Sequence, residues 1–412
     1  MRYGQKLKEV AIQVGGNRNE LREFYLESVA AGKIDTSRVS IRELAQSFMG
    51  DNWKDVLTSY ANGGERFMES TAAIGASGFA VISGQLMVDQ ILEGYKIANT
   101  VIDRLYSPDP ITNGNLGTQI EPGLGDVLLG DDTQAEMEAA PYVQFNGRYI
   151  QVPAPISKRN RAALTMEMIF SDKTGQATDK CKSVGKMMGV WQAEQIYKCI
   201  YGITNPYKEA FTQSSSGTAY NTYITSAGAG PWANKLTNFS LTDWTSIDTL
   251  EQLFANMTDP FTGKRIQVTP NAILVSRANK YTAKRILSAT QVRAGNITSG
   301  TGNQTLSESP LDVEYPVEVD NIANAVLKSA GVTASVVANS AQADSLVVLA
   351  DFKKAFGWRY VPEIGPGVKV TDLPISGEKM SQHIVMECMA ELFGTAYVRD
   401  PRYAVLAYNN SL

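Results

Sequence analysis

Histidine and cysteine are scarce in this chain of 412 residues, and their scarcity excludes several kinds of site. His383 is the one histidine, so a metal centre with several histidine ligands is excluded, and any catalytic triad would have to use this residue. The three cysteines lie far apart in the sequence, which supports neither a disulfide scaffold nor a zinc knuckle. We therefore expect no metal ion and no cofactor.

Charge is also sparse, because charged residues make up 19% of the chain, below the usual quarter. Much of the surface must therefore be neutral or covered by partners. The formal net charge of -4 argues against a dedicated nucleic-acid-binding protein, which would carry a basic face. It does not exclude a protein that surrounds nucleic acid without binding it tightly. The apolar runs are far shorter than a membrane span, and the N-terminus lacks a signal-peptide core. We expect a soluble protein made in the cytosol.

The clearest positive feature is a helical pattern over residues 173–201. Apolar side chains recur at steps of four, three, four and three residues, at Ala177, Cys181, Val184, Met188 and Trp191. Such a helix would extend for roughly 42 Å, well beyond the typical length. We predict Val184, Met188 and Trp191 as its core face, with Lys186 and Gln192 on other faces.

The segments before this helix form a distinct order. Residues 17–64 predict three short helices separated by glycine and polar turns, which suit an arm lying on another surface. Residues 108–132 are rich in proline and glycine and predict a projecting loop. In "YVQFNGRYIQV", Asn146-Gly147 predicts a type I′ hairpin turn, and "RAALTMEMIFSD" predicts a further extended run up to the long helix.

The segments after the helix read differently. Residues 210–234 contain no charged residue but several aromatics, which predicts ordered strands and loops packed against neighbours. From Thr242 the pattern becomes α/β, with a capped helix, a buried strand at Ala272–Ser276 and a second helix. "LDVEYPVEV" predicts a helix or loop, while residues 383–398 and 403–408 predict strands.

No residue pattern amounts to an active site. His383, Glu387 and Glu391 would share one side of a strand, which predicts a solvated or interface face, with a hydrolase using His383 as the less favoured alternative. Ser157–Arg161 is the densest basic cluster; it favours salt bridges with a neighbouring subunit over phosphate binding. Thr262–Arg265 lacks the glycine loop of a nucleotide-binding motif.

The order of these parts resembles the major capsid protein of tailed bacteriophages, the Hong Kong ninety-seven type of fold that encapsulins share. Three stretches carry the likeness: "NRAALTMEMIFSDKTGQATDKCKSVGKMMG", with its D-x-T-G junction, "DPFTGKRIQVTPNAILVSRANKYTAKRIL" and "LADFKKAFGWRYVPEI". The resemblance implies an α+β fold with an N-terminal arm, an extended loop, a peripheral domain with a long spine helix, and an axial domain. The implied boundaries are 1–70 for the arm, 71–107 for the start of the peripheral domain, 108–170 for the extended loop, 171–243 for the peripheral domain with spine helix 173–201, 244–380 for the axial domain and 381–412 for returning strands.

The resemblance also implies a function. The chain would be a structural protein and not an enzyme, assembling as hexamers and pentamers into an icosahedral shell around double-stranded phage DNA. Its partners would be other copies of itself and portal, scaffolding or decoration proteins, and it would be assembled in the host bacterial cytoplasm and reside in the virion. An encapsulin-like cargo shell is the alternative. The predicted inter-subunit residues are Asn146, Gly147, Arg148, Lys158, Arg159 and Arg161.

Overall fold

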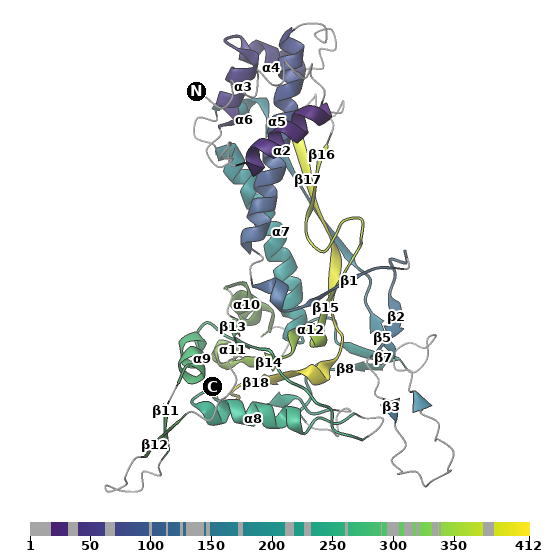
Figure 1. Cartoon of the computed structure of the whole chain (residues 1–412), viewed down its shortest axis with the longest axis vertical. Helices are drawn as coiled ribbons and strands as arrows, with labels where there is room; N and C mark the ends of the chain where they lie inside the picture. Colours follow the sequence, from purple (N-terminus) through teal and green to yellow (C-terminus); the bar gives the residue numbers. More distant parts are fainter. Residues whose placement is uncertain are drawn as a thin grey trace. The chain divides into compact units, whose positions relative to one another are not determined.

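The chain forms two compact units, each built from segments that are distant in the sequence. The computed structural model describes residues 18–31, 40–61, 71–98, 101–112, 114–123, 127–128, 144–145, 149–171, 176–210, 218–225, 232–259, 263–289, 291–294, 305–308, 316–318, 321–331, 337, 339–373 and 383–412 (Figure 1). The first unit comprises Met1–Thr100, Ser157–Trp191 and Glu363–Phe393. The second comprises Val101–Ile156, Gln192–Pro362 and Gly394–Leu412.

Two long helices belong to the first unit: α5 (Thr71–Ala98) and the first part of α7 (Gln176–Ile200). The predicted long helix is therefore confirmed as α7, whereas α5 was not predicted from the sequence. The three predicted short helices are also confirmed, as α2 (Arg18–Ala30), α3 (Ile41–Met49) and α4 (Trp53–Ala61). All three pack against α5 of their own chain. Helix α3 buries Ile41, Leu44, Ala45 and Phe48.

The two long helices approach each other backbone to backbone. A Cβ atom on Gly185 of α7 would collide with the carbonyl oxygen of Ile91 in α5, and one on Gly94 would collide with that of Lys182. Only glycine leaves room for such an approach. An ion pair of 2.6 Å between Lys182 Nζ and Glu93 Oε1 flanks the crossing.

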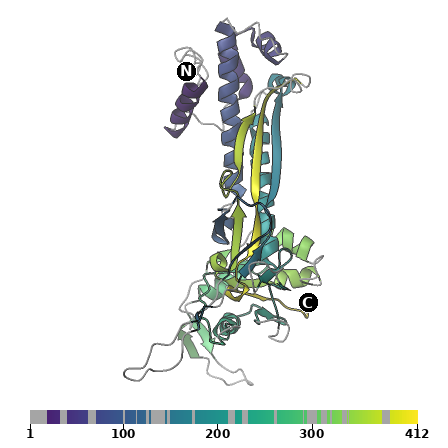
Figure 2. The ribbon, with the colours of Figure 1, turned by 90° about the vertical axis from the view of Figure 1, so that its right-hand side faces the viewer.

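A sheet completes the first unit. Strand β17 (Ile384–Val398) lies between β6 (Ile156–Thr165) and β16 (Lys369–Leu373), and its residues 387–391 pair antiparallel with β16. Figure 2 shows these strands side by side, with β17 in yellow. The predicted strand at residues 383–398 is confirmed. The extended run predicted for "RAALTMEMIFSD" is wrong beyond Thr165.

Residues Met166–Ser171 form helix α6 instead of strand. The Thr165 hydroxyl oxygen accepts a hydrogen bond from Met168 N, as a helix N-cap does. Ile169 is then buried, and the Phe170 ring packs edge-on to Trp53 of α4 with 5.2 Å between centroids. Met166, Glu167 and Met168 are good helix formers, and packing against α3 and α4 stabilises the helix that they favour.

The second unit is organised around a sheet of order β13-β10-β14-β18-β9. Its central strands are β10 (Ala272–Val275), β14 (Val347–Ala350) and β18 (Ala404–Ala407), which are buried at every position, and its outer strands are β13 (Val317–Glu318) and β9 (Lys235–Leu236). The predicted strands at Ala272–Ser276 and at residues 403–408 are confirmed. Part of the stretch predicted as helix or loop pairs as β13.

Helices surround this sheet in the second unit. The two helices predicted after Thr242 are confirmed as α8 (Trp244–Ala255) and α9 (Lys280–Leu287), and the Asp243 carboxylate caps α8 by accepting from Thr245 N. The shorter helical segments are α10 (Asn321–Val326), a π-helical turn (Leu327–Gly331), α11 (Ser340–Ser345), α12 (Phe352–Ala355) and 3-10 turns at Ile102–Arg104 and Pro401–Tyr403.

Further strands of the second unit form smaller arrays. Strand β15 (Phe356–Tyr360) pairs with β1 (Ser107–Pro110) and with the last part of β17, and β11 (Gln291–Ala294) pairs with β12 (Thr305–Glu308). A four-stranded sheet has the order β2 (Gln119–Pro122), β5 (Tyr149–Val152), β7 (Tyr207–Ala210) and β8 (Thr218–Tyr220). Trp232 packs edge-on to Tyr207 and Tyr220, so the described part of residues 210–234 is ordered as predicted.

The hairpin predicted around Asn146-Gly147 is not formed by the strands that flank this dipeptide. Strand β4 (Gln144–Phe145) pairs with β3 (Val127–Leu128), whereas β5 pairs with β2. In the sequence, β3 and β4 stand between β2 and β5, and residues 129–143 stand between β3 and β4. Asn146, Gly147 and Arg148 themselves lie outside the described residues. Long-range pairing with residues 119–128 outweighs the local turn preference.

Candidate assembly surface

The sheet of the first unit has one covered face and one open face. On the covered face, Met386 Sδ lies 2.7 Å from Ser83 Oγ, and Cys388 Sγ contacts the Gly84 carbonyl oxygen of α5. Asn160 of β6 donates to Met188 Sδ of α7 at 3.2 Å. Because side chains alternate along a strand, the neighbouring residues of β6 and β17 point to the opposite, open face.

Cross-strand ion pairs occupy the open face. Arg159 Nε lies 2.6 Å from Glu391 Oε1, and Arg161 Nη1 lies 3.6 Å from Glu387 Oε1. The arginine side chains are 60% and 68% exposed, while the glutamates are 15% and 6% exposed. Glu387 was predicted on a solvated or interface face. A solvated position is wrong, because the Glu387 side chain is 6% exposed and lies beside Arg161, whereas an interface position stays a prediction. Arg159 and Arg161 were expected to form salt bridges with a neighbouring subunit. In the structure they form them with glutamates of their own chain.

Strand β6 forms an edge of this sheet. It pairs with β17, and no other described strand pairs with it. An edge strand presents unpaired backbone donors and acceptors, and lysine or arginine side chains along it discourage unspecific pairing. Lys158, half-buried on this strand, makes no ion pair within the described part of the chain.

The core face predicted for α7 is partly as expected. Met188 is fully buried, as are Ala177 and Cys181, whereas Val184 and Trp191 are only half-buried. Gln192, predicted on another face, is fully buried and hydrogen-bonds the Tyr106 side chain, so that prediction is wrong. The second half of α7 is enclosed on more than one side, which a single-stripe prediction cannot capture.

The β2–β5 ribbon is anchored by a buried arginine that the sequence analysis did not single out. Arg359 of β15 is 1% exposed; its Nη1 lies 3.0 Å from Glu121 Oε1, and its Nη2 donates to Gln119. Burial and the nearby Asp109 raise the pKa of Glu121, against the opposing effect of Arg359. A charged residue inside the apolar run "AFGWRYV" was the available signal.

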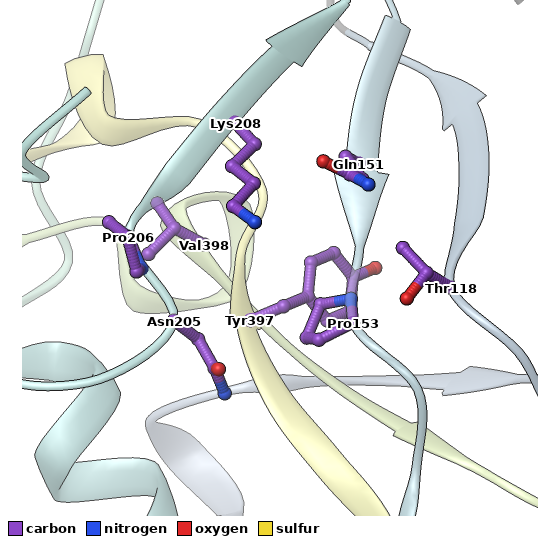
Figure 3. Close-up of a pocket in the computed structure, with 8 residues that line it drawn as sticks. All are labelled: Thr118, Gln151, Pro153, Asn205, Pro206, Lys208, Tyr397 and Val398. Carbon is purple, nitrogen blue, oxygen red and sulfur yellow. The ribbon is translucent and has the colours of Figure 1, made fainter. Parts of the chain in front are cut away.

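A small hollow lies beside this anchor, within the second unit (Figure 3). It has a volume of about 130 Å³ and is lined by Thr118, Gln151, Pro153, Asn205, Pro206, Lys208, Tyr397 and Val398. The Tyr397 hydroxyl donates to Asp109 Oδ2 at 2.7 Å, and the Asn205 amide donates to the Ala396 carbonyl oxygen. Lys208 points toward the hollow, but its lining contains no carboxylate, thiol or imidazole that could work with it as a nucleophile and base pair.

Among the residues that the structure describes, His383 lies in no catalytic group. It is exposed, has a φ of 52° and precedes β17, where its carbonyl oxygen accepts from Met166 N. Cys388 is fully buried and its Sγ contacts the Gly84 carbonyl oxygen of α5, so this thiol is not accessible to a substrate. Among the described residues, no group of three or more His, Cys, Asp and Glu side chains could hold a metal ion. No described helix combines the length and apolarity needed to cross a membrane.

The family assignment comes from comparison with known proteins. A sequence model described as phage capsid protein matches residues 150–376, more than half of the chain. The chain belongs to this family. The match covers β6, α7 and most of the second unit, so the capsid protein's resemblance to tailed-phage major capsid proteins is confirmed. No curated protein sequence matches it.

Solved capsid structures resemble the capsid protein at low identity. The capsid of cyanophage P-SCSP1u is 11% identical, with 75% of this chain and 88% of that chain covered and a TM-score of 0.43. The mature capsid of bacteriophage PhiM1 is 10% identical, with 75% and 86% covered and a TM-score of 0.42. The holo-SrpI encapsulin complex from Synechococcus elongatus PCC 7942 is 12% identical, with 75% and 88% covered and a TM-score of 0.37. At these values the assignment rests on the family match.

The family gives the capsid protein its fold and its general role. It has the α+β fold of the Hong Kong ninety-seven type, and it is a major capsid subunit that assembles with other copies of itself into the phage shell. Members of this family are structural proteins, located in the capsid of the virion.

Proposed function

We propose that the capsid protein assembles as hexamers and pentamers into an icosahedral shell that encloses double-stranded phage DNA. The observation that carries this proposal is the antiparallel pairing of β2 with β5 and of β3 with β4, which we call the ribbon; residues 129–143 stand between β3 and β4 in the sequence. A ribbon of this kind, fixed at one end by Arg359, can reach a neighbouring subunit without adding to its own core. Self-assembly of many copies needs such extensions, because overlap adds interface area.

Charge complementarity supports a role for the ribbon and β6 in these contacts. Residues 129–143 contain four carboxylates and no Lys or Arg. Lys158 of β6 lacks an ion pair within the described residues, so it can accept an acidic group from a neighbour. We retain Asn146, Gly147, Arg148 and Lys158 as proposed inter-subunit residues, with Arg159 and Arg161 contributing through the part of their side chains that stays exposed.

The finer features of the family complete the proposal. The capsid protein would form in the host bacterial cytoplasm with portal and scaffolding proteins as partners, and decoration proteins could add to its outer surface. The division into arm, extended loop, peripheral domain and axial domain belongs to this proposal. No sequence-specific contact with DNA is required, in keeping with the net charge of -4.

Negative-stain electron microscopy of the purified protein tests the proposal directly. We expect closed icosahedral particles or rings of five and six subunits, increasing with protein concentration. A protein that stays monomeric at every concentration would contradict it. Nuclease-resistant double-stranded DNA inside particles from infected cells is expected for a phage head, whereas particles that hold a protein cargo in place of DNA would indicate the encapsulin-like alternative.

A further inference from the structure

One segment of the chain is strongly basic although the whole chain is acidic. Residues 260–307 contain seven Lys or Arg residues and no Asp or Glu, whereas the chain has a net charge of -4. A block of one charge sign is normally an interaction surface or a solvated face. Neither the family assignment nor the proposed ribbon contacts account for this block.

Helix α9 presents the centre of this block on one face. Its buried side is Ala283 and Ile286, which pack inward. On the opposite side Tyr281 is 77% exposed, and Lys284 and Arg285, three and four residues later, are exposed on the same face. We call Lys280, Tyr281, Lys284 and Arg285 the α9 basic face. Figure 1 shows α9 running directly into the β11–β12 strands within its unit.

The cations of this face are not neutralised locally. Lys280 Nζ lies 5.9 Å from the centre of the Tyr281 ring, and Lys280, Lys284 and Arg285 form no ion pair within the described part of the chain. Two carboxylates of adjoining elements are engaged elsewhere. Asp344, whose carbonyl oxygen accepts from Asn279 at the start of α9, is paired with Lys328 at 3.0 Å, and Glu318 of β13 is paired with Arg104 at 3.2 Å.

We propose that the α9 basic face binds the phosphate backbone of double-stranded DNA. Lysine and arginine side chains spaced by about one helical turn, 5.4 Å, can contact successive phosphate oxygens, and the Tyr281 hydroxyl can donate to another. Binding of this kind is independent of base sequence. The source of the DNA rests on the proposed function.

An acidic protein partner is the competing occupant, and two observations favour DNA. A protein interface of useful affinity is centred on buried apolar residues, whereas the exposed side of α9 offers one aromatic ring surrounded by cations. Phosphate binding, in contrast, is carried by cations with a polar aromatic among them. The affinity of a single copy would be low, but many copies in one shell act together on one DNA molecule.

The experiment measures binding of the full-length, unassembled capsid protein to a labelled duplex of random sequence by fluorescence anisotropy. We expect affinity to fall steeply between about 50 mM and 200 mM salt, with a logarithmic slope of about -0.9 per phosphate contacted. The double variant Lys284→Gln/Arg285→Gln should reduce the magnitude of this logarithmic slope by about two. Tyr281→Phe should weaken binding by about threefold and leave the slope unchanged.

The matched control is Lys180→Gln/Lys186→Gln, which removes two exposed lysines from α7 and changes the net charge equally. Its slope should equal that of the unmodified protein. Equal slopes for the two double variants, or competition by polyglutamate as effective as that by DNA, would overturn the proposal. Particle formation by Lys284→Gln/Arg285→Gln is scored separately: normal shells from this variant leave the proposed function intact, and failure of the unmodified protein to form shells counts against that function alone.

Discussion

At the residue scale, glycines decide how closely the two long helices of the first unit approach. Gly185 and Gly94 each face a backbone carbonyl of the opposite helix, so the crossing has no space for a methyl group. Neither glycine stands out in the sequence, because glycine also occurs in its turns and loops. Their role follows from contacts between α5 and α7, whose facing residues are about ninety positions apart.

Gly185→Ala should destabilise the unassembled subunit by at least about 2 kcal/mol, because the methyl group collides with the Ile91 backbone. On an isolated helix the same substitution would stabilise by about 1 kcal/mol, so the sign of the change is diagnostic. Urea unfolding measures it. The neighbouring control, Lys186→Ala on the exposed side, should stay within about 0.5 kcal/mol of the unmodified protein. A more stable Gly185→Ala protein would show that the helices do not cross at this residue.

Buried charges at the residue scale are held in pairs. Arg402 is 5% exposed and lies 2.7 Å from Asp400 and 2.8 Å from Asp259, which is fully buried. Burial lowers the pKa of Arg402, but the adjacent carboxylates raise it more, so its net pKa is raised. The ion pairs join Asp400 and Arg402, near the C-terminus, to Asp259, which follows α8. The free-energy cost of burying these charges is offset because every charge has a partner.

At the element scale, the strands β6 and β17 are joined by side-chain charges as well as by backbone pairing. Arg159 and Arg161 were expected to reach a neighbouring subunit, because a basic cluster in an extended loop has no local partner in the sequence. Glu391 and Glu387 lie more than 220 residues further along the chain, so only the sheet brings them opposite the arginines.

Exchanging the charges of one pair tests this arrangement. Arg159→Glu should lower the unfolding free energy by about 0.5 to 1 kcal/mol, since it removes an attraction and places two carboxylates opposite each other. Adding Glu391→Arg to the same protein should restore most of that loss. Chemical unfolding of unassembled subunits gives both values. If the double variant is no more stable than Arg159→Glu, the ion pair does not form within the subunit.

At the scale of the whole molecule, the chain forms two units from alternating segments, and α7 and β17 contribute residues to both. Among the described strands of the second unit, β3 and β4 pair only with each other. Their connection, residues 129–143, joins β3 to β4, which are two residues long. This connection is therefore the place where shortening separates assembly from folding.

Replacing residues 130–142 with a short glycine-serine turn should leave the unfolding midpoint of the subunit unchanged, because the β2–β5 pairing and Arg359 anchor remain. Particle yield in negative-stain images should fall strongly. A companion variant that keeps the length but converts Asp131, Asp132, Glu136 and Glu138 to their amides tells whether charge or reach is needed. Normal yields from the shortened protein would remove the ribbon from the proposed assembly contacts.

The sequence alone determined those features that depend on neighbouring residues. The three- and four-residue steps after Ala177 predicted α7, the capped pattern from Thr242 predicted α8, and the short apolar runs predicted β10 and β18. The order of these elements was sufficient for the family resemblance. Periodicity, capping and run length are local properties, and each can be read from a window of a few residues.

Only the tertiary structure decided the rest, because those features depend on partners distant in the chain. Helix α5 is buried around most of its circumference between Phe79 and Ile91, so its sequence shows no polar side and therefore no stripe. The residues beside Asn146-Gly147 pair with residues 119–128, and Gln192 is enclosed instead of exposed. Long-range pairing and burial stabilise the folded state by amounts that local preferences do not include. Where local preference and long-range contacts conflict, the long-range contacts prevail.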